Sequence, residues 1–245
     1  MERRRRATTV HHVPLRNRAT PRQEIIADPA RGLVYANRGV LVNARGEIRR
    51  RWGVRRWIAC RLEFKGRRRR PLMAPNRYTE LFFLDEATAF AAGHRPCGEC
   101  RYEDYRRFSA IWQRIHPGQV GADAMDDQLH AERVDASTRE QRMHHLRFDD
   151  LPDGTFVFCD ERPWLVLGDQ LLEWTPAGYV AACRARPHGE TATVLTPPSL
   201  VDVLRSGWDP ATVPFLHPTA QGPSRREPSA DQSPSCSRNA RTRSR

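Results

Sequence analysis

The stretch FFLDEATAFAAGHRPCGEC, residues 82–100, carries the clearest structural signals of the chain. Asp85 is a residue type that caps helix N-termini, and Gly93 suits the left-handed position that follows a helix. We therefore predict a buried strand over residues 78–84, a short helix over residues 86–92, and then a tight turn that contains two cysteines. A second helix over residues 101–115 follows, because apolar side chains recur there at spacings of three and four.

The rest of the chain predicts short strands and further helices. We expect a hairpin over residues 40–48, a strand over 57–64, a helix over 122–133, strands over 155–159, 164–167, 171–174 and 191–195, and a helix over 198–204. The predicted fold is therefore α+β. Short strands accompany a zinc-knuckle-like strand-helix-CxxC-helix unit, and a small antiparallel sheet and a helix come after it.

The Cys-x-x-Cys turn indicates a metal site. Six cysteines in 245 residues are too few for a disulfide scaffold. Cys97 and Cys100 are therefore interpreted as ligands of one metal ion, which we expect to be zinc. A structural zinc site has four protein ligands. Cys60 is the predicted third ligand. The fourth is left open between His94, Cys159, His130 and water.

Other interpretations of these cysteines stay open. Cys97 and Cys100 could form a dithiol redox pair, or a knuckle that has lost its metal and keeps the fold by packing. Cys60 could be a small buried hydrophobe. Residues 96–101 also resemble half of the zinc site of nucleoside deaminases, but the required His-x-Glu or Cys-x-Glu is not found upstream.

Residues 82–100 as a whole resemble the second half of the Ada-type zinc-binding domain. The shared order is an aromatic strand, an acid-capped Glu-Ala helix, a glycine, and Arg-Pro-Cys-x-x-Cys. The resemblance implies that Cys97 and Cys100 are the second ligand pair of a four-cysteine zinc site, and that the protein acts on DNA, in repair or restriction. In that family one cysteine of the first pair accepts a methyl group from DNA phosphate. The first pair should read Cys-x-x-x-Cys, and here Phe64 stands four residues after Cys60.

The charged residues are distributed unevenly, so that the chain has a basic half and an acidic half. Residues 23–118 carry twenty Lys and Arg against ten Asp and Glu, whereas residues 119–220 carry eight against sixteen. The basic half predicts nucleic acid as a partner. Its predicted contacts are Arg55, Arg56, Arg67, Arg68, Arg69, Arg70, Arg95 and Arg101. The chain has a single lysine among its 41 basic residues, and a GC-rich genome would also produce that bias.

The same composition defines four regions. Residues 1–22 and 221–245 are expected to be disordered basic tails, because they contain too few apolar side chains to fold alone. Residues 23–118 form the basic Ada-like metal-binding region, and residues 119–220 form an acidic α+β region. The two can also form one compact unit, since opposite charges attract.

The predicted helix over residues 122–133 offers an alternative function. Asp123, Asp126, Asp127 and His130 share one face of it, and acids beside an imidazole can bind a metal or transfer protons. A metal-dependent hydrolase or nuclease would use Asp127, His130 and Glu132 as its catalytic residues. The simpler interpretation is an acidic face that is solvated or paired with the basic half.

Three functions follow from the sequence. The leading one is a zinc-binding protein associated with nucleic acid. The others are the metal-dependent hydrolase and a zinc-stapled scaffold without a nucleic-acid role. No apolar run is long enough to cross a membrane, and the basic N-terminus lacks the apolar segment of an export signal, so we expect a cytoplasmic protein. Whether it is an enzyme, and in which oligomeric state, is left open.

Overall fold

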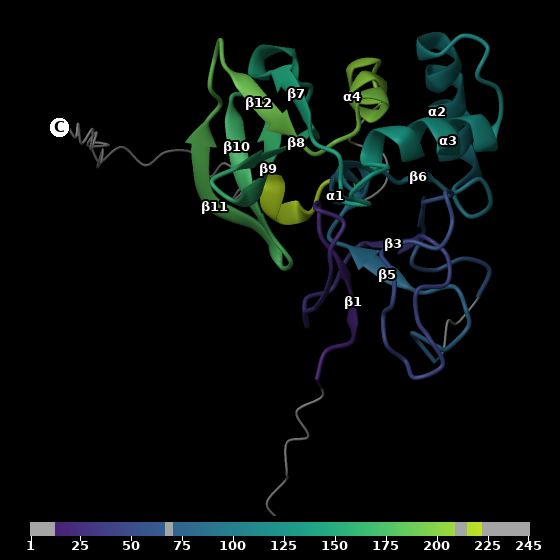
Figure 1. The fold of residues 1–245 in the computed structure, drawn as a ribbon. Coiled ribbons are helices and arrows are strands. Elements are labelled where there is room, and N and C mark those ends of the chain that lie inside the picture. The colour runs from purple at the N-terminus through teal and green to yellow at the C-terminus, as the bar shows by residue number, and fades with distance from the viewer. Residues whose placement is uncertain (1–12, 67–70, 209–214, 222–245) are drawn as a thin grey trace, which may run out of the picture.

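Two six-stranded sheets and four helices make up the described part of the chain, residues 13–66, 71–208 and 215–221 of a computed structural model (Figure 1). The two sheets lie at different ends of the molecule, and the first helix contacts strands of both. The α+β class predicted from the sequence is confirmed.

The N-terminal sheet positions the cysteine turn. Its strand order is β2-β1-β5-β3-β4-β6. The strands are β1 (Arg16–Ala19), β2 (Ile25–Ala27), β3 (Val34–Asn37), β4 (Ile58–Cys60), β5 (Leu81–Phe83) and β6 (Arg95–Pro96). The pairs β1–β5 and β4–β6 are parallel, and the others are antiparallel. The parallel pair β4–β6 brings two segments more than thirty residues apart to one edge of the sheet.

The C-terminal sheet is antiparallel, with the order β11-β10-β9-β8-β12-β7. Its strands are β7 (His144–Arg147), β8 (Phe156–Cys159), β9 (Arg162–Leu167), β10 (Gln170–Thr175), β11 (Gly178–Ala185) and β12 (Thr191–Val194). Gly168 has a φ of +56° in the two-residue turn between β9 and β10, a conformation that glycine adopts without strain.

The helices are α1 (Glu86–Ala91), α2 (Tyr102–Ile115), α3 (Ala122–Arg133) and α4 (Pro198–Arg205), with 3-10 turns at Phe148–Asp150 and Pro218–Gln221. Asp85 caps α1 as predicted, because its Oδ1 accepts a hydrogen bond from the Thr88 backbone N–H at 2.8 Å. Its Oδ2 accepts from Tyr179 Oη–H and from the backbone N–H of His217, each at 2.8 Å. The cap of α1 is therefore also tied to β11 and to the C-terminal described segment.

The largest hydrophobic core combines residues from both halves of the sequence. Phe90, Phe108 and Trp112 come from α1 and α2, and they lie in the same buried cluster as Phe156 and Leu200 of the second half. Smaller clusters lie against each sheet, with residues of α1 in the first and of α4 in the second. The helices thus pack both halves around shared apolar side chains.

Several elements differ from the sequence-based expectation. β1 lies within residues 1–22, which we predicted to be a disordered tail, and it pairs with β2 and β5. β7 and β11 were not predicted. The strands expected over 57–64 and 78–84 are only three residues long, as β4 and β5. Residues 1–12 and 222–245 of the two predicted tails lie outside the described residues.

Candidate metal centre

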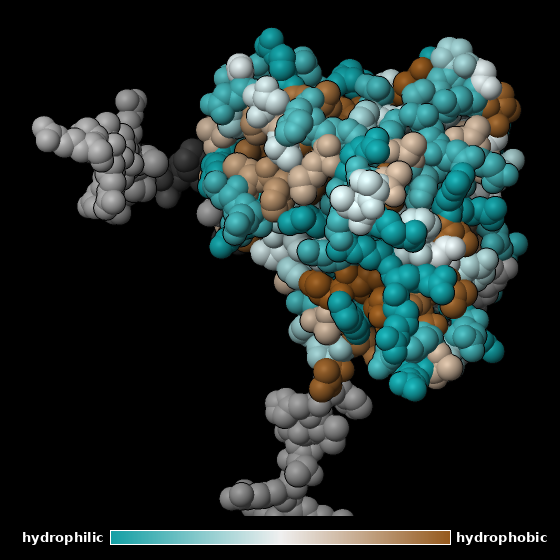
Figure 2. Space-filling view, viewed as in Figure 1, coloured by the Kyte–Doolittle hydropathy of each residue, from teal (hydrophilic) through white to brown (hydrophobic). Residues whose placement is uncertain are grey.

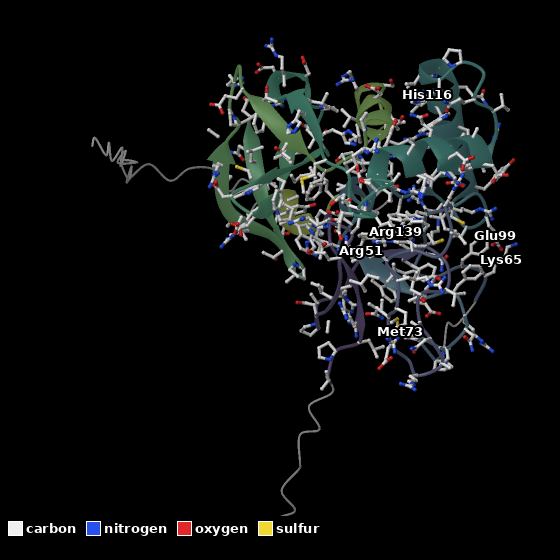
Figure 3. All side chains as sticks on the ribbon, viewed as in Figure 1. Arg51, Lys65, Met73, Glu99, His116 and Arg139 are labelled. Atoms are coloured by element: carbon white, nitrogen blue, oxygen red, sulfur yellow. The ribbon has the colours of Figure 1, made fainter. Side chains whose placement is uncertain are left out.

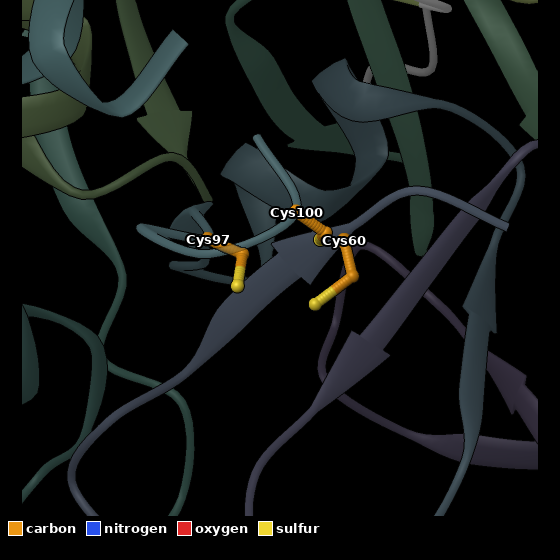
Figure 4. Close-up of side chains that lie close together, drawn as sticks. All are labelled: Cys60, Cys97 and Cys100. Atoms are coloured by element: carbon orange, nitrogen blue, oxygen red, sulfur yellow. The ribbon is translucent and has the colours of Figure 1, made fainter. Parts of the chain in front are cut away.

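Three cysteines meet beside the edge of the N-terminal sheet (Figure 4). Cys60 ends β4, Cys97 follows β6, and Cys100 precedes α2. β6 lies parallel to β4, and the backbone N–H of Cys97 donates to the Ala59 carbonyl at 2.9 Å. This pairing brings the Cys-x-x-Cys turn to Cys60, the upstream cysteine that the sequence proposed as third ligand.

The geometry of the three thiols suits a small cation. Their Sγ atoms all lie within 4.8 Å of one another, and each residue is at most 7% exposed. Thiolates about 2.3 Å from a tetrahedral zinc are separated by about 3.8 Å, which is compatible with three sulfurs gathered this closely. The cluster could therefore hold a metal ion, as predicted for Cys60, Cys97 and Cys100.

Hydrogen bonds to sulfur favour the thiolate forms. The backbone N–H of Glu99 donates to Cys97 Sγ, and that of Arg61 donates to Cys100 Sγ, both at 3.4 Å. Hydrogen bonds from Cys100 and Cys60 lower the pKa of Cys97 to about 2. The pKa of Cys60 is raised, mainly because its thiol donates to Cys100 and Cys97. The hydrogen bonds among the three thiols therefore favour the thiolate at Cys97 over that at Cys60.

None of the three protein side chains named from the sequence as a possible fourth ligand lies at the cysteine cluster. In the described part of the chain, no other Cys, His, Asp or Glu joins the three sulfurs within 4.8 Å. His94 Nε2 instead accepts a hydrogen bond from Arg38 Nε at 3.3 Å, and His130 packs edge-on against Trp52 with ring centroids 4.6 Å apart. Cys159 lies in β8, in the other sheet, and accepts from Arg184. Water is the candidate that remains from the sequence-based set.

A pocket of about 610 Å³ opens directly onto the three cysteines. Aromatic side chains of Tyr35, Phe64 and Tyr78 line one part of it, and ionic side chains of α3 and the segment before β4 line another. Glu99, which stands between the two cysteines of the turn, is an exposed lining residue at the periphery of the molecule (Figure 3).

The acidic residues of α3 are paired with arginines of the basic half. Asp126 and Arg95 form a buried ion pair at 2.7 Å, and Asp127 forms an exposed one with Arg55 at 2.8 Å. Asp123 lies 3.9 Å from Arg56. These contacts match the interpretation of an acidic face paired with the basic half.

The catalytic trio Asp127, His130 and Glu132 is not brought together. Glu132 caps α4, where its side chain accepts from the Ser199 backbone N–H at 3.0 Å and from Ser199 Oγ–H at 2.5 Å. Asp127 faces Arg55, and His130 faces Trp52. The hydrolase alternative therefore lacks its predicted constellation, because the three side chains of one helix are engaged with three different partners.

The prediction of contact with nucleic acid is wrong for two of the arginines. Arg95 and Arg101 are only 2% and 1% exposed, and each is held by carboxylates, Arg101 by Glu86 and Asp104. A buried, neutralised guanidinium cannot reach a phosphate. Arg55 and Arg56 have side chains about two-thirds exposed, and their contact with nucleic acid stays a prediction. Arg67, Arg68, Arg69 and Arg70 lie outside the described residues.

Sequence reasoning missed a buried cationic cluster next to the cysteine turn. The guanidinium groups of Arg38 and Arg133 lie 4.6 and 4.2 Å from the ring centroid of Trp57. Arg133 also donates to the carbonyl of Gly93 at 2.7 Å. Its side chain packs so close to Gly93 that a Cβ there would lie 2.5 Å from Arg133 Cδ. No motif marks these arginines in so arginine-rich a chain.

Acidification is expected to destabilise the protein through His94. Burial beside Arg38 and Arg133 holds the pKa of His94 well below its usual range, so the folded protein binds no proton there while the unfolded chain does. The free energy of unfolding should fall as pH drops below about 6.5, by up to about 1.4 kcal/mol per pH unit.

Urea unfolding of wild type and His94→Gln between about pH 7 and about pH 5 measures how steeply the free energy of unfolding depends on pH in each protein, and the variant should show the smaller slope. The exposed His145→Gln is the control and should keep the wild-type slope. Equal slopes in all three proteins would contradict the assignment.

Comparison with known proteins finds no matching family model, no matching curated protein and no matching solved structure. The function must therefore be argued from this chain alone. Among the residues that the structure describes, no helix is long and apolar enough to cross a membrane.

Proposed function

We propose that the protein binds one zinc ion through Cys60, Cys97 and Cys100. The observation that carries this proposal is the convergence of three buried thiols from two distant segments within 4.8 Å. Buried thiol groups this close together repel one another once ionised, and a divalent cation removes that repulsion. Zinc is the ion that thiolate sets of this kind most commonly hold in proteins.

The three ligands would give the zinc a firm attachment to the fold. Cys60 is fixed by the pairing of β4 with β3 and β6, and Cys97 by its backbone hydrogen bond to Ala59. Two backbone N–H groups directed at Cys97 and Cys100 would stabilise the thiolates in the bound state. The bound ion would supply a Lewis-acidic centre on which a fourth ligand can be held.

The test is the zinc content of the purified chain. Elemental mass spectrometry is expected to find about one zinc per wild-type chain and almost none in the Cys97→Ser/Cys100→Ser double variant. Cys183→Ser is the matched control, because Cys183 lies exposed in β11 and should leave the zinc in place. A folded wild-type chain without zinc, after purification in zinc-containing buffer, would contradict the proposal.

An association with nucleic acid is a second candidate. It is supported by the excess of basic residues over 23–118 and by the exposed side chains of Arg55 and Arg56 beside the pocket. A role in DNA repair or restriction rests on the Ada resemblance of residues 82–100. The carboxylates that pair with these arginines would have to release them to phosphate, which weakens this candidate relative to the metal site.

Salt dependence tests the nucleic-acid candidate. Fluorescence anisotropy with labelled DNA should show an affinity that falls with salt, and Arg55→Gln/Arg56→Gln should reduce the log–log slope by about 2. Arg162→Gln is the control, since Arg162 is exposed in the acidic half. No binding at low salt, or a slope unchanged by the double variant, would exclude these arginines as phosphate contacts.

A further inference from the structure

The three cysteines leave one corner of a tetrahedron without a protein ligand in the described part of the chain. No fourth Cys, His, Asp or Glu joins them within 4.8 Å. The nearby histidine, His94, is turned away into a fully buried contact with Arg38 and Trp57. A metal held here would therefore have three thiolates and one further position.

That position has access to solvent through the pocket of about 610 Å³. All three cysteines belong to the lining of the pocket, so a metal ion that they held would border it. Structural zinc sites are closed by four protein ligands, whereas zinc sites that act on other molecules keep one position open. A pocket of this size is large enough for a small organic molecule.

The walls of the pocket combine two kinds of surface. Tyr35 and Phe64 form an apolar part next to the sulfurs, where they pack with the cysteines in one cluster. Opposite charges line the rest, with Arg55 and Arg56 beside Asp123 and Asp127. Such a surface suits a small molecule with an apolar end towards the metal and a zwitterionic end towards these side chains.

We propose that the fourth position of this metal centre is open to the pocket and takes an exchangeable low-molecular-weight thiol. The inference rests on the proposed zinc site and goes beyond it, since the centre would bind an external ligand and would not be a structural site closed by four protein ligands. A thiol is the class that fits best, because the centre is soft, already holds three sulfur ligands, and is bordered by apolar side chains.

The exchange balances without a further reactant. The thiol S–H bond breaks, the sulfur forms the fourth bond to the metal, and the water molecule held there before is released. The proton passes to solvent at the mouth of the pocket. No electron is transferred, so neither an oxidant nor a reductant is required.

Counting the sulfur ligands tests the proposal. X-ray absorption at the zinc edge of the zinc-loaded full chain should give three sulfurs and one lighter atom, and four sulfurs after addition of L-cysteine or 2-mercaptoethanol. L-serine, which differs from L-cysteine only by oxygen in place of sulfur, should leave the count at three. The cobalt-substituted protein should show a saturable change in its visible absorption with the same two thiols and none with L-serine.

Three results would overturn the proposal. Four sulfur ligands before any thiol is added would mean that the chain closes the site itself, and a lower count in Cys236→Ser would identify the closing residue. A count that stays at three with both thiols would mean that the position does not take this ligand. Loss of zinc to the thiol, without a four-sulfur protein site, would have the same meaning. A chain that binds no zinc at all would instead refute the proposed function.

Discussion

Asp126→Ala is expected to lower the free energy of unfolding by about 3–5 kcal/mol, the usual cost of leaving a buried charge without its partner. The Asp126 carboxylate accepts two hydrogen bonds from Arg95, from Nε–H at 2.9 Å and from Nη2–H at 2.7 Å. Both side chains are at most 4% exposed, so water cannot replace the lost carboxylate. Urea unfolding followed by tryptophan fluorescence measures the loss.

The neighbouring residue provides the control for this prediction. Asp127 pairs with Arg55, but both side chains are more than half exposed, so Asp127→Ala should change stability by no more than about 1 kcal/mol. The two variants remove the same group from the same helix, and each removes an ion pair with an arginine, buried in one case and exposed in the other. Similar losses in both would contradict the argument that burial sets the cost.

A double replacement separates the pair from the isolated charge. Burial raises the pKa of Asp126 despite the attraction of Arg95, which indicates that the ion pair does not fully offset the desolvation of its carboxylate. Replacing both partners by apolar residues, in Arg95→Met/Asp126→Leu, is therefore expected to restore much of the stability that Asp126→Ala loses. A double variant as unstable as the single one would show that the pair itself stabilises the fold.

The cysteines and the Arg95–Asp126 ion pair differ in how well the sequence predicts them. A Cys-x-x-Cys turn has a fixed local spacing, so Cys97 and Cys100 are recognisable without a structure. Asp85 and Gly93 mark the two ends of α1, the helix before this turn. The two partners of a long-range ion pair have no fixed spacing in the sequence. In the sequence Arg95 looks like an exposed basic residue, and only the structure shows that it is buried and paired with Asp126 of α3.

Long-range pairing limited the prediction of the fold. The helices α2, α3 and α4 have local apolar periodicity and clear ends, and their predicted ranges agree with the structure to within one or two residues. β6 has two residues and becomes a strand only because it pairs with β4, and β7 has a polar sequence whose pairing with β12 no local pattern indicates. Cys60 was predicted as a ligand because it is the only cysteine before the turn, where the resemblance to the Ada-type domain implies a first ligand pair. The β4–β6 pairing is what brings it to the turn.

Removing zinc with a chelator is expected to lower the free energy of unfolding by about 4 kcal/mol, if free zinc had been a thousandfold above its dissociation constant. The ligands come from the end of β4, the residue after β6 and the second residue before α2. Only the folded chain brings these segments together, so zinc binds the folded state in preference to the unfolded one. For a chain of this length the midpoint of thermal unfolding should fall by about 8–16 °C.

The Cys97→Ser/Cys100→Ser variant shows whether this effect arises at the cluster. It should melt at a lower temperature than wild type, and the chelator should not lower its midpoint further, because no zinc remains to be removed. Cys183→Ser, whose thiol is exposed in β11, should respond to the chelator as wild type does. A wild-type protein that holds one zinc yet melts at the same temperature with and without chelator would contradict the prediction. The ion would then contribute little to the stability of the fold, and the sheet and helix contacts around Cys60 would have to hold the turn without it.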